Sequence, residues 1–268
     1  MGETTKLANL INPQVIADFV DQKLIDKIVF APLADIDQTL VGRPGSILEF
    51  PSYAYIGAAS DLTEGSAIST VSLNASTVSK QIKEAGKGVE ITDTALLSAF
   101  GNPTNEIGNQ LLKAMADKID IDFLADLAAI DSTMTTSGVS NVMDISNSLE
   151  KFGEDIDGQK ALLVAPALYT KIRNTKDWAP ASEFAAGALV KGSVGQIFGC
   201  DIMVSNRLRT SGNAYIVKPG ALRLILKRDS LVESDRDILR RVNVHTITKH
   251  YVTYLYNAKN AIKLTMAT

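Results

Sequence analysis

The stretch NPTNEIGNQLLKAMADKIDIDFLADLAAI, residues 102–130, decides the fold. Asn102 followed by Pro103 is typical of a helix start, because the asparagine side chain accepts from a free N–H group and proline has none to leave unpaired. Apolar residues then recur every three or four positions. They are Ile107, Leu111, Met115, Ile119, Phe123, Leu124 and Leu127. We predict one helix to about residue 130, roughly 40 Å long. A helix of this length indicates a supporting role in the fold.

The sequence after this helix indicates a compact mixed segment followed by strands. Asp144 is expected to cap a short helix. The run KALLVA, residues 160–165, is typical of a buried strand, and Pro166 then begins another short helix. The other elements expected are a helix at 181–190, two short strands within 196–205, and strands at 214–217, 222–227, 239–255 and 261–266.

Before the long helix, three segments stand out. Asn12 and Pro13 begin an amphipathic helix that runs to about residue 30. Residues 42–88 are rich in Gly, Ser and Thr with short alternating runs, which favours an extended hairpin with two strand-like arms and a long tip. A short helix is expected from Thr92 to Phe100. Helices and a closing antiparallel sheet together predict an α+β fold.

Composition limits the possible functions. The chain has 268 residues and a net charge of −3, which argues against binding nucleic acid through bulk positive charge. It has one cysteine, Cys200, and two histidines, His245 and His250. A multi-cysteine zinc or iron–sulfur site and a three-histidine metal site are therefore excluded. The N-terminal segment lacks the pattern of a signal peptide, and no apolar run is long enough to span a membrane.

No set of residues predicts catalysis. The acid row Asp117, Asp120, Asp122 and Asp126 diverges around the helix at about 100° per residue, so we expect these side chains on solvated faces. Gly192, Gly195 and Gly199 do not have the spacing of a dinucleotide fingerprint and are expected in turns. His245 and His250 are expected on opposite faces of a strand, and Cys200 at a buried strand start. We expect no catalytic, cofactor-binding or metal-binding residues and no cofactor.

The order of these parts resembles the major capsid proteins of tailed bacteriophages, of the Hong Kong 97 type. The resemblance rests on KLANLINP at 6–13, on GKGVEITD at 86–93, and on GSVGQIFG at 192–199 with its following strand. The closing strands of residues 251–266 are also similar to those of this family. The likeness spans the whole chain, and the order of the motifs is more specific than any one of them.

The resemblance implies a Hong Kong 97-like major capsid fold. Its parts would be an N-arm (1–42), an E-loop hairpin (43–88), a peripheral domain with the spine helix (89–135 and 227–259) and an axial domain (136–226, with 260–268 as a candidate addition). It implies a structural, non-enzymatic protein that assembles into the pentamers and hexamers of an icosahedral head around double-stranded DNA. The implied partners are other copies, a scaffolding protein, a portal and DNA held by confinement, with no membrane. The implied location is the virion, and the host cytoplasm before assembly.

The hairpin is the expected contact between subunits. No Lys or Arg lies between Arg43 and Lys80, so its tip is acidic and lacks the lysine that some relatives use for a covalent cross-link. The expected contact residues are Glu49, Tyr53, Tyr55, Asp61 and Glu64 on the hairpin, facing Arg240, Arg241 and Lys249 of a neighbour. Three other functions stay open: an encapsulin-like nanocompartment shell with protein cargo, an enzyme of unrecognised class, and a tail or adhesin component.

Overall fold

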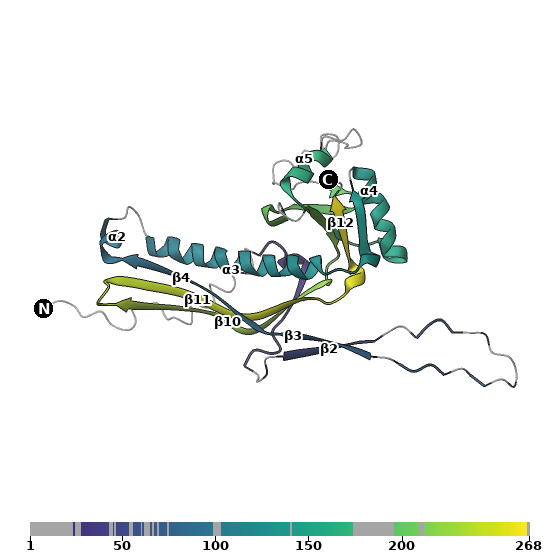
Figure 1. Ribbon diagram of the computed structural model, residues 1–268, viewed down its shortest axis with the longest axis horizontal. Coiled ribbons are helices and arrows are strands. Elements are labelled where there is room, and N and C mark those ends of the chain that lie inside the picture. Colours follow the sequence, from purple (N-terminus) through teal and green to yellow (C-terminus); the bar gives the residue numbers. More distant parts are fainter. Residues whose placement is uncertain are drawn as a thin grey trace.

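The computed structural model describes residues 24, 28–42, 45, 47–53, 56–59, 61, 65, 67–68, 70–73, 75–98, 103–139, 141–173, 196–208 and 212–266. In Figure 1 the helix α3 lies along a long β-sheet, a second sheet with its own helices stands at one end, and a two-stranded hairpin runs away from both. No helix in the described ranges is long and apolar enough to cross a membrane. The α+β class expected from the sequence is confirmed.

The long helix α3, Pro103–Ala128, agrees with the prediction. It covers one face of a four-stranded sheet with the order β1-β10-β11-β4. These strands are β1 (Ala34–Asp37), β10 (Leu222–Asp237), β11 (Val242–Leu255) and β4 (Lys83–Thr92). The apolar stripe of α3 enters the main core, where Leu111, Met115, Ile119, Phe123 and Leu127 are buried. The helix therefore stiffens this sheet along its length.

The second sheet has six strands in the order β5-β12-β9-β6-β8-β7. They are β5 (Thr135–Val139), β12 (Ala261–Met266), β9 (Asn213–Val217), β6 (Lys160–Val164), β8 (Cys200–Val204) and β7 (Gln196–Ile197). Every residue of β6 is buried, as expected. Helices α4 (Val142–Ser148), η4 (Leu149–Ile156) and α5 (Pro166–Arg173) flank this sheet and share its core. The last strand of the chain, β12, thus lies between β5 and β9 in a sheet whose other strands come from the middle of the chain.

The hairpin forms a separate two-stranded sheet. Strand β2, Ile47–Tyr53, pairs antiparallel with β3, Ala75–Gln81, in continuous register. Strand β4 begins only two residues after β3, yet it pairs with β11 of the four-stranded sheet. The paired part of the hairpin therefore ends at residue 81, and residues 83–88 belong to the long sheet.

Shorter elements connect these parts. They are η2 (Ala31–Leu33), α2 (Asp93–Ser98), η3 (Ser132–Met134), η5 (Asn206–Leu208) and η6 (Ala258–Asn260). Thr92 Oγ1 accepts from the backbone N–H of Ala95, so α2 begins where the sequence predicted. The helix expected at 181–190 lies outside the described residues.

Two local expectations differ from the structure. Asp144 does not cap α4: Asn141 is the N-cap, and Asp144 stands at the third helical position, where its carboxylate accepts from the backbone of Asn141 in a capping box. The helix expected from Asn12 lies largely outside the described residues. Its last part packs within its own subunit, because Leu24 and Ile28 are buried in the main core.

Candidate functional site

The two histidines and the cysteine do not form one site, because both histidines belong to β11 and Cys200 belongs to β8 of the other sheet. His245 Nδ1 lies 2.7 Å from Ser234 Oγ, and His250 Nε2 lies 3.6 Å from a carboxylate oxygen of Glu84. Cys200 is buried at the start of β8, and burial raises the pKa of its thiol to about 11. Such a thiol is protonated at neutral pH and is a poor nucleophile. Within the described ranges no group of three His, Cys, Asp or Glu side chains could hold a metal ion.

The expectation that the acid row on α3 is solvated is wrong for two of its members, Asp120 and Asp122, which are buried. Asp120 is fully buried and accepts from the backbone N–H groups of Val29 and Phe30, each at 3.2 Å. Arg207 Nη1 lies 3.0 Å from the same carboxylate, and Arg207 also pairs with Asp117. Burial raises the pKa of Asp120 despite these partners. The carboxylate therefore fixes the segment before β1 against the middle of α3.

Asp122 and Asp126 fix the root of the hairpin to the same helix. Asp122 accepts from Lys83 Nζ at 2.6 Å, from Lys118 Nζ at 2.8 Å and from Tyr251 Oη at 2.6 Å. Asp126 lies 3.1 Å from Lys80 Nζ. Burial by itself would raise the pKa of Asp122, but the bonds from the two lysines and Tyr251 outweigh it and the pKa is lowered. The direction in which the hairpin leaves the body is thus set by ion pairs from β3 and β4 to α3.

A patch of exposed apolar side chains lies at the end of the long sheet farthest from the hairpin. We call it the distal tip and define it as Leu96, Leu97, Ile238 and Leu239. Leu97 is 86% exposed, Ile238 78% and Leu239 96%. The first two residues belong to α2 and the others to the turn between β10 and β11, and Figure 1 shows both elements at the same end of the molecule.

Polar contacts hold the two halves of the distal tip together. Asp93 at the start of α2 pairs with Arg236 at 2.7 Å and accepts from Asn243 Nδ2 at 3.1 Å. The backbone N–H of Asp93 donates to the carbonyl of Arg241, and Arg240 pairs with Glu90 at 3.0 Å. These bonds present the leucines in a fixed arrangement. Exposed apolar side chains gathered at one end of a molecule are typical of a protein–protein contact.

Sequence reasoning missed the distal tip, although a signal was present. Ile238 and Leu239 are an apolar pair inside the polar and charged run SDRDILRR, residues 234–241; a strand was expected to begin at Leu239, but this pair lies in the turn between β10 and β11. Turns are normally polar, so an apolar pair at the turn indicates a surface that another molecule covers. The α2 leucines carried no comparable signal, because short amphipathic helices usually bury such residues.

The predicted contact residues have different environments. Glu49 and Asp61 are exposed on the hairpin, and Arg241 is exposed at the turn. Arg240 is exposed but already paired with Glu90 of its own chain. Lys249 is only 3% exposed and its amine lies 3.2 Å from Ser230 Oγ, so it does not face a neighbour and that expectation is wrong. Tyr53 lies in β2, while Tyr55 and Glu64 lie outside the described residues.

The hairpin also exposes apolar residues. The exposed members are Ile47, Ile56, Ile68, Val71 and Leu73. Among the described residues, the hairpin joins a core at its root: Leu48 packs with Ile225, Val252 and Tyr254 of the long sheet, as does Ile82 just beyond β3. An acidic and apolar arm that its own chain leaves uncovered is the second surface suited to a protein partner.

Comparison with known proteins gives a consistent result. A family model described as phage capsid protein matches residues 75–262. The chain is 35% identical over 263 residues to the major capsid protein of Staphylococcus phage phiMR11, covering 97% of this chain and 95% of the relative.

Solved structures show the same fold. The capsid structure of the cyanophage P-SCSP1u matches with a TM-score of 0.69 at 16% identity. The match covers 89% of this chain and 88% of the cyanophage chain. The capsid protein of cyanophage Pam1 has a TM-score of 0.69 at 10% identity, covering 91% of this chain and 93% of its own. The mature capsid of bacteriophage PhiM1 has a TM-score of 0.69 at 11% identity, covering 89% and 87%.

Proposed function

Since this chain belongs to the phage capsid protein family, we propose that its hairpin and its distal tip are the surfaces that join copies into a closed head. The chain is a major capsid protein, a structural component of the phage shell, and its place is the virion. The Hong Kong 97-like fold agrees with assembly into pentamers and hexamers around double-stranded DNA.

The observation that carries the surface assignment is the position of exposed apolar residues. They concentrate on the hairpin and at the distal tip, which project from the long sheet toward opposite ends of the molecule (Figure 1). A ring or shell of identical copies needs different surfaces that complement each other, because a single self-complementary patch closes after two copies. Two separate surfaces at opposite ends meet this need.

The domain boundaries expected from the sequence serve as the proposed parts of the shell subunit. The N-arm would be 1–42, the E-loop 43–88, the peripheral domain 89–135 with 227–259, and the axial domain 136–226 with 260–268. Strand β1 pairs with β10, and β4 pairs with β11. These pairings support a peripheral domain that also includes the ends of the N-arm and of the E-loop.

The remaining partners follow from charge and from the family. We propose that a scaffolding protein and a portal take part in assembly in the host cytoplasm, and that the protein has no enzymatic role. The DNA inside would be held by confinement and weak contacts. The net charge of −3 supports this, because strong binding to duplex DNA needs many unpaired cations in one place.

The test is electron microscopy of the expressed protein, with and without residues 46–80. The full chain is expected to form shells or shell fragments. The deletion removes β2 and nearly all of β3 but leaves the main core intact, so it should give folded subunits that form no closed shell. Circular dichroism is the control for folding. Closed particles from the deletion variant would contradict the role of the hairpin.

We further expect the mature shell to be free of covalent cross-links. The two lysines at the hairpin root are engaged within their own subunit, Lys80 with Asp126 and Lys83 with Asp122, and Cys200 is buried. Denaturing gel electrophoresis of boiled particles without reductant should show a single band at 28.7 kDa. A ladder of dimers to hexamers would be the contrary result.

A further inference from the structure

Three parts of the chain that are distant in sequence meet at the carboxylate of Asp120. Asp120 belongs to α3 and is fully buried. The backbone N–H groups of Val29 and Phe30, from the segment before β1, donate to its two oxygens at 3.2 Å each. Arg207 reaches the same carboxylate from η5, with Nη1 3.0 Å from one oxygen. Because η5 connects β8 with β9, one side chain joins the N-terminal segment, the long helix and the six-stranded sheet.

The backbone of η5 fixes Arg207 to the six-stranded sheet. Ser205 Oγ accepts from the backbone N–H of Arg207 at 3.3 Å, and the Ser205 carbonyl accepts from the N–H of Leu208 at 3.3 Å. The N–H of Ser205 in turn donates to the carbonyl of Val164 at the end of β6. Any shift of this sheet along α3 therefore moves the guanidinium group relative to Asp120.

The site holds a charge that depends on its partners. Burial raises the pKa of Asp120, and the two N–H bonds and Arg207 oppose that rise only in part. Among the described residues, the charged groups that face Asp120 are Arg207 of η5 and Asp117 of α3, and Arg207 pairs with both carboxylates. Withdrawal of one partner of a buried ion pair leaves the other charge uncompensated. Without Arg207, Asp120 must take up a proton or reach water, and either change weakens its bonds to the two backbone N–H groups.

We infer that Asp120 couples the six-stranded sheet to the N-terminal segment, so that residues 28–30 stay attached to α3 only while η5 holds Arg207 on the same carboxylate. Displacement of the sheet relative to α3 then releases the segment. Release of the segment likewise loosens the sheet, because a coupling between two sites is reciprocal. Arg207 is a positioning residue, since it acts through Asp120. The coupling goes beyond the proposed function, because it lies within one subunit and does not depend on assembly.

The experiment is amide hydrogen exchange on the full chain, kept below the concentration at which it assembles. Exchange at Val29 and Phe30 is compared with exchange in the buried strand β6, whose amides report opening of the whole subunit. Arg207→Gln should raise the rate at Val29 and Phe30 about tenfold more than the rate in β6, within the range of about 5- to 150-fold that is usual for such couplings. Loss of stability alone would change both rates equally.

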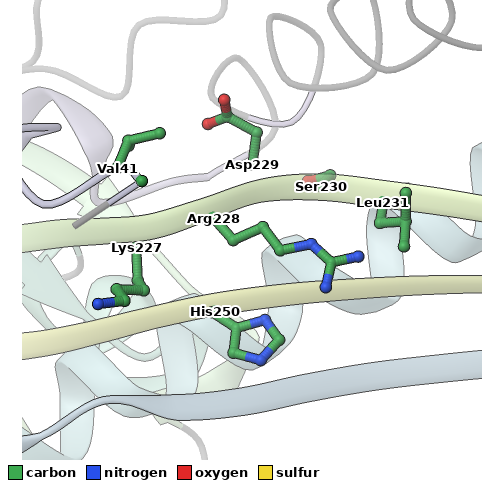
Figure 2. A pocket seen from close by; sticks show the side chains of 8 residues that line it. Val41, Lys227, Arg228, Asp229, Ser230, Leu231 and His250 are labelled. Atoms are coloured by element: carbon green, nitrogen blue, oxygen red, sulfur yellow. The ribbon is translucent and has the colours of Figure 1, made fainter. Parts of the chain in front are cut away.

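The matched control is Arg228→Gln, which removes an exposed arginine from the four-stranded sheet. The register between β10 and β11 shifts on both sides of Arg228, which is the mark of a β-bulge. Arg228 lines a groove of about 860 Å³ with His250 and Val41, and Figure 2 shows its side chain directed towards β11. No carboxylate of the described residues lies within ion-pair distance of it. The control removes the same charge away from Asp120, so the exchange ratio should stay unchanged.

Two further measurements separate this coupling from a general loss of packing. In an Asp120→Asn background the buried charge is gone, so adding Arg207→Gln should change the exchange ratio by less than about twofold. The NMR signal of the Asp120 carboxyl carbon should titrate at a higher pH in Arg207→Gln than in the unaltered chain, because the arginine favours the ionised form and its loss raises the pKa further.

Arg207→Lys serves if Arg207→Gln does not fold. It keeps the positive charge but loses the planar group that reaches both carboxylates, so it should raise the exchange ratio about threefold. A ratio that stays unchanged in the Arg207 variants would overturn the inference. So would an equal effect of Arg207→Gln with and without Asp120→Asn, or a carboxyl that titrates at the same pH in both chains. These results are independent of shell formation, which the deletion of residues 46–80 tests.

Discussion

Leu239→Asp is expected to reduce shell formation by about a hundredfold or more while leaving the subunit folded. Leu239 is 96% exposed in the subunit, so its side chain contributes almost nothing to the core. If the distal tip is covered by a neighbour, each buried leucine stabilises that contact by about 1.5–3 kcal/mol. A carboxylate in its place loses this gain and adds the cost of burying an unpaired charge.

The measurement for Leu239→Asp is the amount of shell that sediments from equal concentrations of protein. The subunit is checked by urea denaturation, where its free energy of unfolding should change by less than about 0.5 kcal/mol. Leu239→Met keeps the apolar character and serves as the control that still assembles. Leu97→Asp tests the other half of the tip and should behave like Leu239→Asp. Normal shells from both aspartate variants would remove the distal tip from the assembly surfaces.

Asp122→Ala should have the largest effect on the stability of the unassembled subunit. The Tyr251 hydroxyl is buried and would lose its charged acceptor, at a cost of about 1.5–3 kcal/mol. Lys83 and Lys118 are nearly half exposed and can bind water instead, so they add only about 0–1 kcal/mol each. The free energy of unfolding should fall by about 3 kcal/mol.

Urea denaturation measures this effect of Asp122→Ala, with Glu106→Ala as control. Glu106 is exposed on the same helix and, within the described part of the chain, its side chain bonds to Gln110 alone, so its loss should cost about 0.5 kcal/mol or less. Tyr251→Phe, combined with Asp122→Ala, should cost less than the sum of the single variants, because both remove the same bond. Additive effects would mean that the two groups do not interact.

The charge of Asp122 also predicts a pH dependence. The pKa of Asp122 is lowered in the folded subunit, so its stabilisation is fully present above the ordinary carboxyl pKa of about 4 and is lost as the pH falls towards the folded value. The raised pKa of Asp120 acts in the opposite direction. The comparison is therefore between the unaltered chain and Asp122→Asn, whose difference in stability should shrink on acidification. A constant difference would contradict an ionised Asp122.

Elements with a strong local pattern could be predicted from the sequence. The apolar stripe from Ile107 to Leu127 predicted α3, and the run at 160–164 predicted the buried strand β6. The last strand, β12, lies where it was expected, whereas β10 continues to Asp237, well beyond the expected 222–227, and β11 begins at Val242 rather than at residue 239. These patterns are local because each residue's burial depends on the period of its own helix or strand. The cap of α4 was misplaced by three residues, because both Asn141 and Asp144 are good capping residues and only the backbone decides between them.

The candidate surfaces depended on pairings that the sequence does not reveal. Asp122 looked solvated when only the geometry of its helix was considered, but Lys83 and Tyr251, distant along the chain, enclose it. The exposed leucines of the distal tip and the groove at Arg228 likewise arise from the packing of α2 on a turn and from a bulge in β10.

By itself, the sequence determined the helix α3, the strands β6 and β12, the acidic hairpin tip without lysine, and the family resemblance that comparison has confirmed. Only the tertiary structure decided which charged side chains are paired or buried inside the subunit and which remain exposed to a neighbour. The physical reason is that secondary structure follows from the period of neighbouring residues, whereas burial and ion pairing depend on which distant strands and helices pack together. Lys249 and Arg228 lie only 21 positions apart in the sequence, yet packing buries the first and leaves the second exposed at the edge of a groove.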